Sequence, residues 1–170
     1  ILRCLVGSEM CIRDRVLADQ VELAEGLHVL DLACGTGAVA RHVAPKVGAT
    51  GRIVGVDLNE GMLTEAARHV PDGFSIEWVA GDACDLEFAD GSFDVVFCQQ
   101  ALQYVPDREA AASEMARVLR SGGKAVAAVW RSMDHNPIQR TWSRCVVEHI
   151  SEDAAVCLLY TSDAADEWLR

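Results

Sequence analysis

The stretch HVLDLACGTGAVARHV, residues 28–43, runs from an apolar, strand-like segment through a glycine-containing turn into a helical pattern. Gly35 and Gly37 remove two side chains from the turn, so the backbone there can approach a ligand closely. This order of elements is typical of α/β domains that bind nucleotide-like ligands. The ligand is either a dinucleotide, whose pyrophosphate would lie at the turn, or a molecule without phosphate.

Five short apolar runs are spread along the chain, each bounded by glycine, aspartate or asparagine, which is typical of strands. All but the third are close to continuously apolar, as expected of strands buried on both faces of a parallel sheet. The five runs are HVLDLA (28–33), RIVGVD (52–57), SIEWVA (75–80), FDVVFC (93–98) and GKAVAAVW (123–130).

Helical patterns separate these runs. Asn59 can cap one helix, Pro45 is expected to stop another, and the Gly122-Gly123 pair is expected to end a third. Strands that alternate with helices imply right-handed crossovers. The sequence therefore predicts an α/β fold, a Rossmann-like doubly wound sheet with five parallel strands. We expect helices over 38–44, 60–69, 107–120 and 136–150, and a loop over 82–92.

Composition excludes several classes of function. The 170 residues are 51% hydrophobic, but no window approaches eighteen unbroken apolar residues, so we expect no membrane span. A formal net charge of -11 argues against a nucleic-acid surface. The cysteines show no Cys-x-x-Cys spacing and the histidines form no cluster, so no metal site is expected. With no secretory layout at the N-terminus, the chain is expected to be cytoplasmic.

The two ends do not resemble the middle of the chain. LVGSEMCIRDR (5–15) and CLLYTSDAADE (157–167) each resemble a translated sequencing-library adapter. We therefore expect residues 1–15 and 157–170 to be non-native tails and residues 16–156 to be a partial domain. The alternative is an ordinary frayed N-terminus and a C-terminal helix.

Polar side chains end the first four runs, where ligands of open parallel sheets bind. Asp57, at the end of the second run, can accept hydrogen bonds from two ribose hydroxyls, which both a dinucleotide and an adenosyl ligand offer. Asp31 discriminates between them, because a carboxylate close to a pyrophosphate is unfavourable, whereas an ammonium would be attracted. Asp82, after the third run, is suited to accept from an adenine amine. These acids favour a cationic adenosyl ligand, although all three could instead be strand ends and helix caps.

With these features, the chain resembles the class I S-adenosylmethionine-dependent methyltransferases, and within them the small-molecule group that includes the ubiquinone and menaquinone C-methyltransferases. Four motifs carry the resemblance, in the family's order and spacing. They are VLDLACGTG (29–37), GVDLNEGML (55–63), GDACDLEFADGSFDVVFCQQALQYVPD (81–107) and RVLRSGGKAVAAVW (117–130).

The resemblance implies S-adenosyl-L-methionine as cofactor, a small-molecule methyl acceptor as partner, and in-line transfer of the methyl group to a carbon, oxygen or nitrogen nucleophile. No catalytic residue is assigned: His135 is the only histidine in a plausible position for a general base, and it is interpreted as a solvated loop side chain. Gln100 and Tyr104 would face the acceptor. The implied cofactor-binding residues are Asp31, Ala33, Gly35 and Gly37 at the methionine end, Asp57 at the ribose, Leu58 and Met62 near adenine and ribose, Asp82 and Ala83 at the adenine edge, and Gln99 beside the sulfonium.

The family's sheet has seven strands, and the two that follow the fifth are missing from the sequence pattern, as are most of the N-terminal lid helices. We therefore expect 123–130 to be an exposed apolar edge prone to aggregation. We also expect the fragment to bind the cofactor weakly or to be inactive. The alternatives are a non-catalytic cofactor-binding remnant and an NAD(P)-binding oxidoreductase domain. A nucleic-acid methyltransferase is disfavoured by the net charge and by FCQQAL in place of an Asn-Pro-Pro-Tyr signature.

Overall fold

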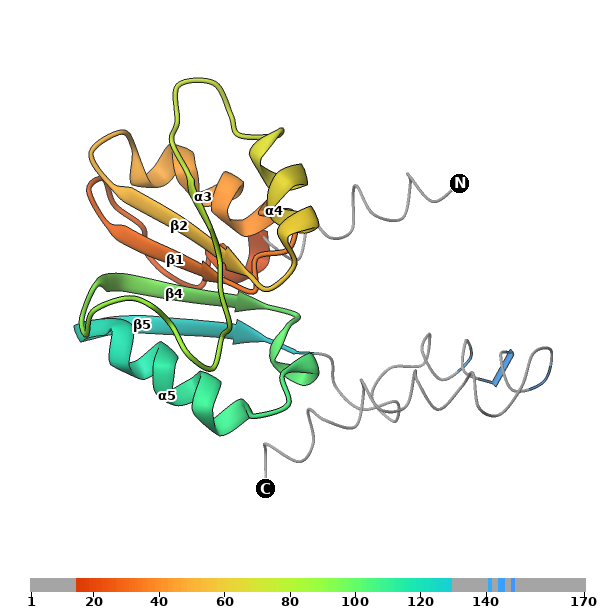
Figure 1. Ribbon diagram of the computed structural model, residues 1–170. Helices are drawn as coiled ribbons and strands as arrows, with labels where there is room; N and C mark the ends of the chain where they lie inside the picture. Colours follow the sequence, from red (N-terminus) through yellow and green to blue (C-terminus); the bar gives the residue numbers. More distant parts are fainter. Residues whose placement is uncertain (1–14, 130–140, 142–143, 146–147, 149–170) are drawn as a thin grey trace. The chain divides into compact units, whose positions relative to one another are not determined.

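The computed structural model describes residues 15–129, 141, 144–145 and 148. The chain divides into two compact units, one formed by Ile1–Gln99 with Val105–Ala128 and the other by Gln100–Tyr104 with Val129–Arg170. The sheet and its helices belong to the first unit (Figure 1). Residues 1–14 and 157–170 of the expected adapter tails lie outside the described residues. So does all of the expected helix over 136–150 except residues 141, 144, 145 and 148.

The first unit contains a five-stranded sheet in the order β3-β2-β1-β4-β5, and every neighbouring pair of strands is parallel. The predicted Rossmann-like α/β fold with five parallel strands is thereby confirmed. In the described part of the chain, β3 and β5 are the edges. The strands are β1 (His28–Leu32), β2 (Arg52–Asp57), β3 (Glu77–Ala80), β4 (Phe93–Gln99) and β5 (Leu119–Ala128).

The helices lie between the strands, as the alternating pattern predicted. In the first unit α3 (Ala38–Val47) contacts β1 and β2, α4 (Glu60–Ala67) contacts β2 and β3, and α5 (Arg108–Val118) contacts β5. The second unit holds a 3-10 helix, η1 (Leu102–Tyr104). No helix among the described residues is long and apolar enough to cross a bilayer.

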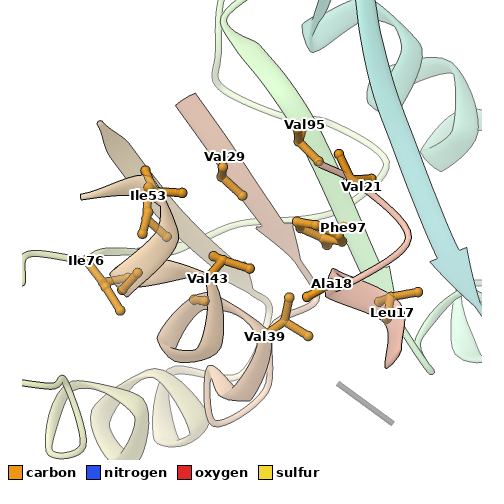
Figure 2. Close-up of a cluster of buried hydrophobic side chains, with 13 residues drawn as sticks. Leu17, Ala18, Val21, Val29, Val39, Val43, Ile53, Ile76, Val95 and Phe97 are labelled. Carbon is orange, nitrogen blue, oxygen red and sulfur yellow. The ribbon is translucent and has the colours of Figure 1, made fainter. Parts of the chain in front are cut away.

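The α3 face of the sheet carries the core drawn in Figure 2. Val39 and Val43 of α3 pack there with Val29 of β1, Ile53 of β2 and Phe97 of β4. Alternate residues of a strand point to opposite faces of the sheet. The fully buried neighbours Leu30, Leu32, Val54, Val56 and Val96 therefore face the other way. Burial on both faces explains why these strands read as continuous apolar runs.

Two expected helix ends were wrong. α3 continues through Pro45 to Val47, because Val47 is fully buried and this packing offsets the backbone hydrogen bond that proline cannot donate. α5 ends at Val118, and β5 begins with Leu119 paired to Phe93. Gly122, with φ +82, therefore lies inside β5, where the register with β4 shifts, rather than at a helix end.

The start of α4 was predicted correctly. The Asn59 side chain accepts hydrogen bonds from the amides of Gly61 (2.9 Å) and Met62 (3.3 Å), which are free donors of the first helical turn. The expected loop over 82–92 is likewise confirmed, since it contains turns and one isolated bridge, between Asp82 and Asp85.

Candidate functional site

The strand-end residues gather because all five strands are parallel, so their carboxyl ends share one edge of the sheet. β1 has β2 on one side and β4 on the other, so the strand order reverses there. Such a reversal is where open α/β sheets bind their ligands. Asp31, Ala33, Asp57 and Gln99 all lie at or just beyond these strand ends.

The turn after β1 is tightly folded. Ala33, Gly35 and Gly37 have φ values of 52, 54 and 73, all in the left-handed region. The Gly37 amide donates to the Cys34 carbonyl (2.8 Å), and the Cys34 amide donates to the carbonyl of Val56 on β2 (2.9 Å). A Cβ added to Gly35 would have no atom within 4 Å, so the backbone at Gly35 is open to a ligand.

Asp57 joins this turn to the end of β2. Its Oδ2 accepts from the Gly35 amide (2.7 Å) and its Oδ1 from the Asn59 amide (2.9 Å). An ionised carboxylate can accept about four hydrogen bonds. Asp57 is half-buried, so after these two backbone contacts it can still accept from a ligand.

Asp31 is buried, with 1% of its surface exposed, and its Oδ2 accepts from the amide of Ala40 (2.9 Å). Ala40 lies in the first turn of α3, whose N-cap residue, Gly37, offers no side-chain acceptor. A strand carboxylate thus satisfies a free donor of the helix and lies at the positive end of its dipole. The alternative from the sequence, that Asp31 caps a helix, is correct for this contact. The role of Asp31 toward a ligand remains a prediction.

Asp82 and Ala83 follow β3. The Gly81 amide donates to the backbone carbonyl of Asp57 (3.1 Å), which ties this loop to the end of β2. Asp82 is exposed, and its Oδ1 accepts from the Cys84 amide (2.9 Å). Ala83 is half-buried.

A pair on α5 that the sequence reading missed holds the rest of this loop. Glu114 accepts from the Leu86 amide (2.7 Å), and Arg117 donates to the carbonyls of Leu86 (2.8 Å) and Phe88 (2.7 Å). The two side chains also form an ion pair (2.7 Å). Their three-residue spacing on one helix was visible in the sequence, but their loop partners lie far away in the chain.

This pair predicts a pH effect on stability. The Arg117 hydrogen bond, followed by that of the Leu86 amide, lowers the pKa of Glu114 from 4.5 to about 2. Because the pKa is lower in the folded protein, the stabilisation is complete above the unfolded pKa and is lost as the pH falls from about 4.5 toward 2. We expect Glu114→Gln to reduce the loss of unfolding free energy between pH 5 and pH 3, measured by urea unfolding. An unchanged loss would contradict the effect.

Apolar side chains stand in solvent beside Asp57. Leu58 is 77% exposed and Met62, in the first turn of α4, is 43% exposed. Leu58 immediately follows the Asp57 carboxylate, and Met62 shares the Asn59-capped turn. This neighbourhood offers apolar surface to a flat ring and a carboxylate to polar hydroxyls.

Glutamines lie at the end of β4 and just after it. Gln99 belongs to the first unit, and its buried Oε1 has no hydrogen-bond partner among the described residues. Gln100 (φ +55) and Tyr104 (59% exposed) belong to the second unit. Their implied role toward an acceptor remains a prediction.

Cys34 lies within the turn but is not suited to act as a nucleophile. Burial raises the pKa of its thiol, and the carboxylates of Asp31 and Asp57 raise it further. The thiol is therefore neutral near pH 7 and weakly reactive. No group of three or more potential metal ligands occurs among the described residues, and His135 lies outside them.

Ala33 gives a test of the turn's backbone. A left-handed conformation costs a residue with a Cβ about 1–2 kcal/mol, and glycine avoids most of this cost. We expect Ala33→Gly to raise the free energy of unfolding by about 1 kcal/mol. The matched control, Ala116→Gly in α5, should lower it by about 1 kcal/mol. Urea unfolding checks both variants, and destabilisation by Ala33→Gly would show that the turn is unstrained.

A parallel sheet with an open glycine turn after β1 and a carboxylate at the end of β2 defines an α/β domain of the class that binds nucleoside-containing cofactors. Residues 29–123 match the family model described as a methyltransferase domain, and the chain belongs to that family. The resemblance to class I S-adenosylmethionine-dependent methyltransferases is thus confirmed.

Named relatives agree with this assignment. The demethylmenaquinone methyltransferase of Staphylococcus aureus (strain MRSA252) is 39% identical over 114 residues, which are 67% of this chain and 47% of the relative. The chain therefore spans about half the length of that relative. A solved S-adenosylmethionine-dependent methyltransferase from Mesorhizobium loti is 28% identical, with a TM-score of 0.61 over 69% of this chain and 52% of that one. A second, from Aquifex aeolicus, has 20% identity and a TM-score of 0.66 over 74% and 68% of the two chains, and supports the fold alone.

Proposed function

We propose that this domain binds S-adenosyl-L-methionine and transfers its methyl group to a small-molecule acceptor. The observation that carries the proposal is that a carboxylate of the chain itself, Asp31, binds an amide at the N-terminus of α3. In dinucleotide-binding domains, amides at this helix terminus bind the pyrophosphate. Here the Ala40 amide already donates to the buried Asp31 carboxylate. A pyrophosphate at this position would meet a negative charge and find one of its donors engaged, which disfavours the oxidoreductase alternative.

The residues at the strand ends fit the proposed cofactor. Asp57 retains acceptor capacity for the two ribose hydroxyls, and the exposed Leu58 and Met62 offer apolar surface beside it. Asp82, also exposed, can accept from the adenine amine, with Ala83 beside it. The cofactor, once bound, supplies a methyl group activated on a positively charged sulfur.

The turn after β1 is assigned the methionine end of the cofactor. Gly35 leaves its backbone open, and Ala33 and Gly37 complete the left-handed turn around it. Asp31 supplies negative charge below the turn, which favours an ammonium group over an anion. Gln99, whose Oε1 at the end of β4 has no partner among the described residues, is assigned to the sulfonium region.

The chain's contribution to catalysis is proposed to be positioning. An in-line displacement needs no covalent intermediate, and holding the donor and acceptor in line can supply much of the acceleration. The neutral Cys34 thiol agrees with this reading. The acceptor belongs to the class of small carbon, oxygen or nitrogen nucleophiles, and demethylmenaquinone is the first to assay because the S. aureus relative carries that name.

The test is a pair of titrations on the purified 170-residue chain. We expect calorimetry to show saturable binding of S-adenosylhomocysteine, and nicotinamide fluorescence to show no binding of NADH. Binding of NADH alone, or of neither molecule, would contradict the proposal. Transfer of a tritiated methyl group to demethylmenaquinone then separates a methyltransferase from a non-catalytic cofactor-binding domain.

A further inference from the structure

The middle of β2 has a glycine where a large apolar residue is expected. Gly55 is buried, and it pairs with Asp31 on β1 and with Trp78 on β3. Residues in register on neighbouring parallel strands point to the same face, so all three belong to one row on the α3 face of the sheet. A glycine inside a strand marks a close approach by another group.

The approaching group is the indole ring of Trp78. A Cβ added to Gly55 would overlap the Cζ3 and Cε3 atoms of that ring and would lie 3.1 Å from the Cys34 sulfur. A Cβ added to Gly37 would overlap the same ring at Cη2 and would lie 2.7 Å from Cζ3. One side chain from β3 thus covers Gly55 and also touches the last residue of the turn.

Packing holds the ring in this position. Trp78 is partly buried against the hydrophobic core of the α3 face. Its buried Nε1–H has no acceptor among the described residues. A phenylalanine at this position would therefore keep an aromatic ring without breaking a hydrogen bond that the structure describes.

We propose that Trp78 is a positioning residue of the cofactor site, whose ring supports the glycine turn and thereby sets the affinity for the S-adenosyl ligand. The inference rests on the proposed function. The ring fixes how far the backbone of Gly37 stands from Gly55, and the turn of which Gly37 is part donates its Gly35 amide to Asp57. Without the ring, the turn can move toward β2, and the open backbone at Gly35 and the Asp57 carboxylate lose their relative placement. Binding geometry depends on such supporting residues to within fractions of an ångström.

Three single variants of the full chain test this role by calorimetry with S-adenosylhomocysteine. Trp78→Leu removes the support, and we expect binding to weaken roughly tenfold. Trp78→Phe should retain affinity within about threefold of the unaltered chain. Gly55→Ala, whose backbone needs no positive φ, should weaken binding because its methyl group displaces the ring. Each titration is made under conditions in which circular dichroism shows that the variant is folded.

The double variant Gly55→Ala/Trp78→Leu shows whether the two positions act through the same contact. Without the indole ring the added methyl group has nothing to displace, so the double variant should bind no more weakly than Trp78→Leu alone. This pattern would support the inference, because a role in stability alone would lower the melting temperature and leave the dissociation constant of the folded protein unchanged.

The outcomes separate the two proposals. If the unaltered chain binds and both Trp78→Leu and Gly55→Ala bind equally well, the positioning role is overturned and the proposed function stands. If Trp78→Leu does not fold, Gly55→Ala and Trp78→Phe still test the positioning role. If both of these variants bind as tightly as the unaltered chain, the role is overturned. If the unaltered chain does not bind S-adenosylhomocysteine, both proposals fail.

Discussion

Asp57→Ala is expected to weaken S-adenosylhomocysteine binding by at least about 100-fold, because in the proposed site the variant loses charge-assisted hydrogen bonds to the ribose worth about 1.5–3 kcal/mol each. The substitution also removes the acceptor of the Gly35 and Asn59 amides, which join the turn after β1 to the turn after β2. The loss therefore combines a missing ligand contact with a loosened site. Isothermal titration calorimetry on the folded variant measures it.

Asp72→Ala is the matched control for charge. Asp72 is an exposed carboxylate in the segment before β3, so its removal changes the net charge by the same amount without touching the strand ends. We expect its affinity to equal that of the unaltered chain. If Asp57→Ala binds as tightly as Asp72→Ala, the ribose role of Asp57 is wrong.

Gly37→Ala is expected to lower the free energy of unfolding by about 2–5 kcal/mol, the sum of left-handed backbone strain and steric overlap in a packed core. Gly37 has a φ of +73, and its new Cβ would overlap the Trp78 ring. The ring cannot retreat easily, because it is packed over Gly55. Urea unfolding followed by far-ultraviolet circular dichroism measures the loss.

Gly35→Ala separates strain from overlap. Gly35 has a similar φ of +54, but an added Cβ meets no atom within 4 Å. We expect this variant to lose only the conformational cost, about 1–2 kcal/mol. Equal losses in the two variants would mean that the indole ring does not restrict Gly37.

The sequence allowed prediction of features that depend on local chemistry. The apolar runs became strands, Asn59 capped α4, and Asp57 came at the end of β2, because each depends on a residue and its immediate neighbours. The strand-end position of the acids followed from parallel topology alone.

Features set by contacts between distant residues could not be predicted. The bond from the Ala40 amide to Asp31 requires the exact packing of α3 on β1. The burial of Val47 carries α3 past Pro45, although local propensity predicts a stop there. Likewise, the role of Glu114 and Arg117 depends on partners in the loop over 86–90, which lie far away in the chain.

The contact of Trp78 with Gly37 and Gly55 has a consequence for folding. The glycine turn belongs to β1 and α3, whereas the ring comes from β3, the short edge strand added to the sheet beyond β2. The turn is therefore fully supported only after β3 has paired with the sheet, which closes the large loop from β1 to β3. Such contacts between distant parts of the chain form slowly during folding. Ligand affinity then reports completion of this half of the sheet, and a ligand that binds only the completed form stabilises the β3 edge by mass action.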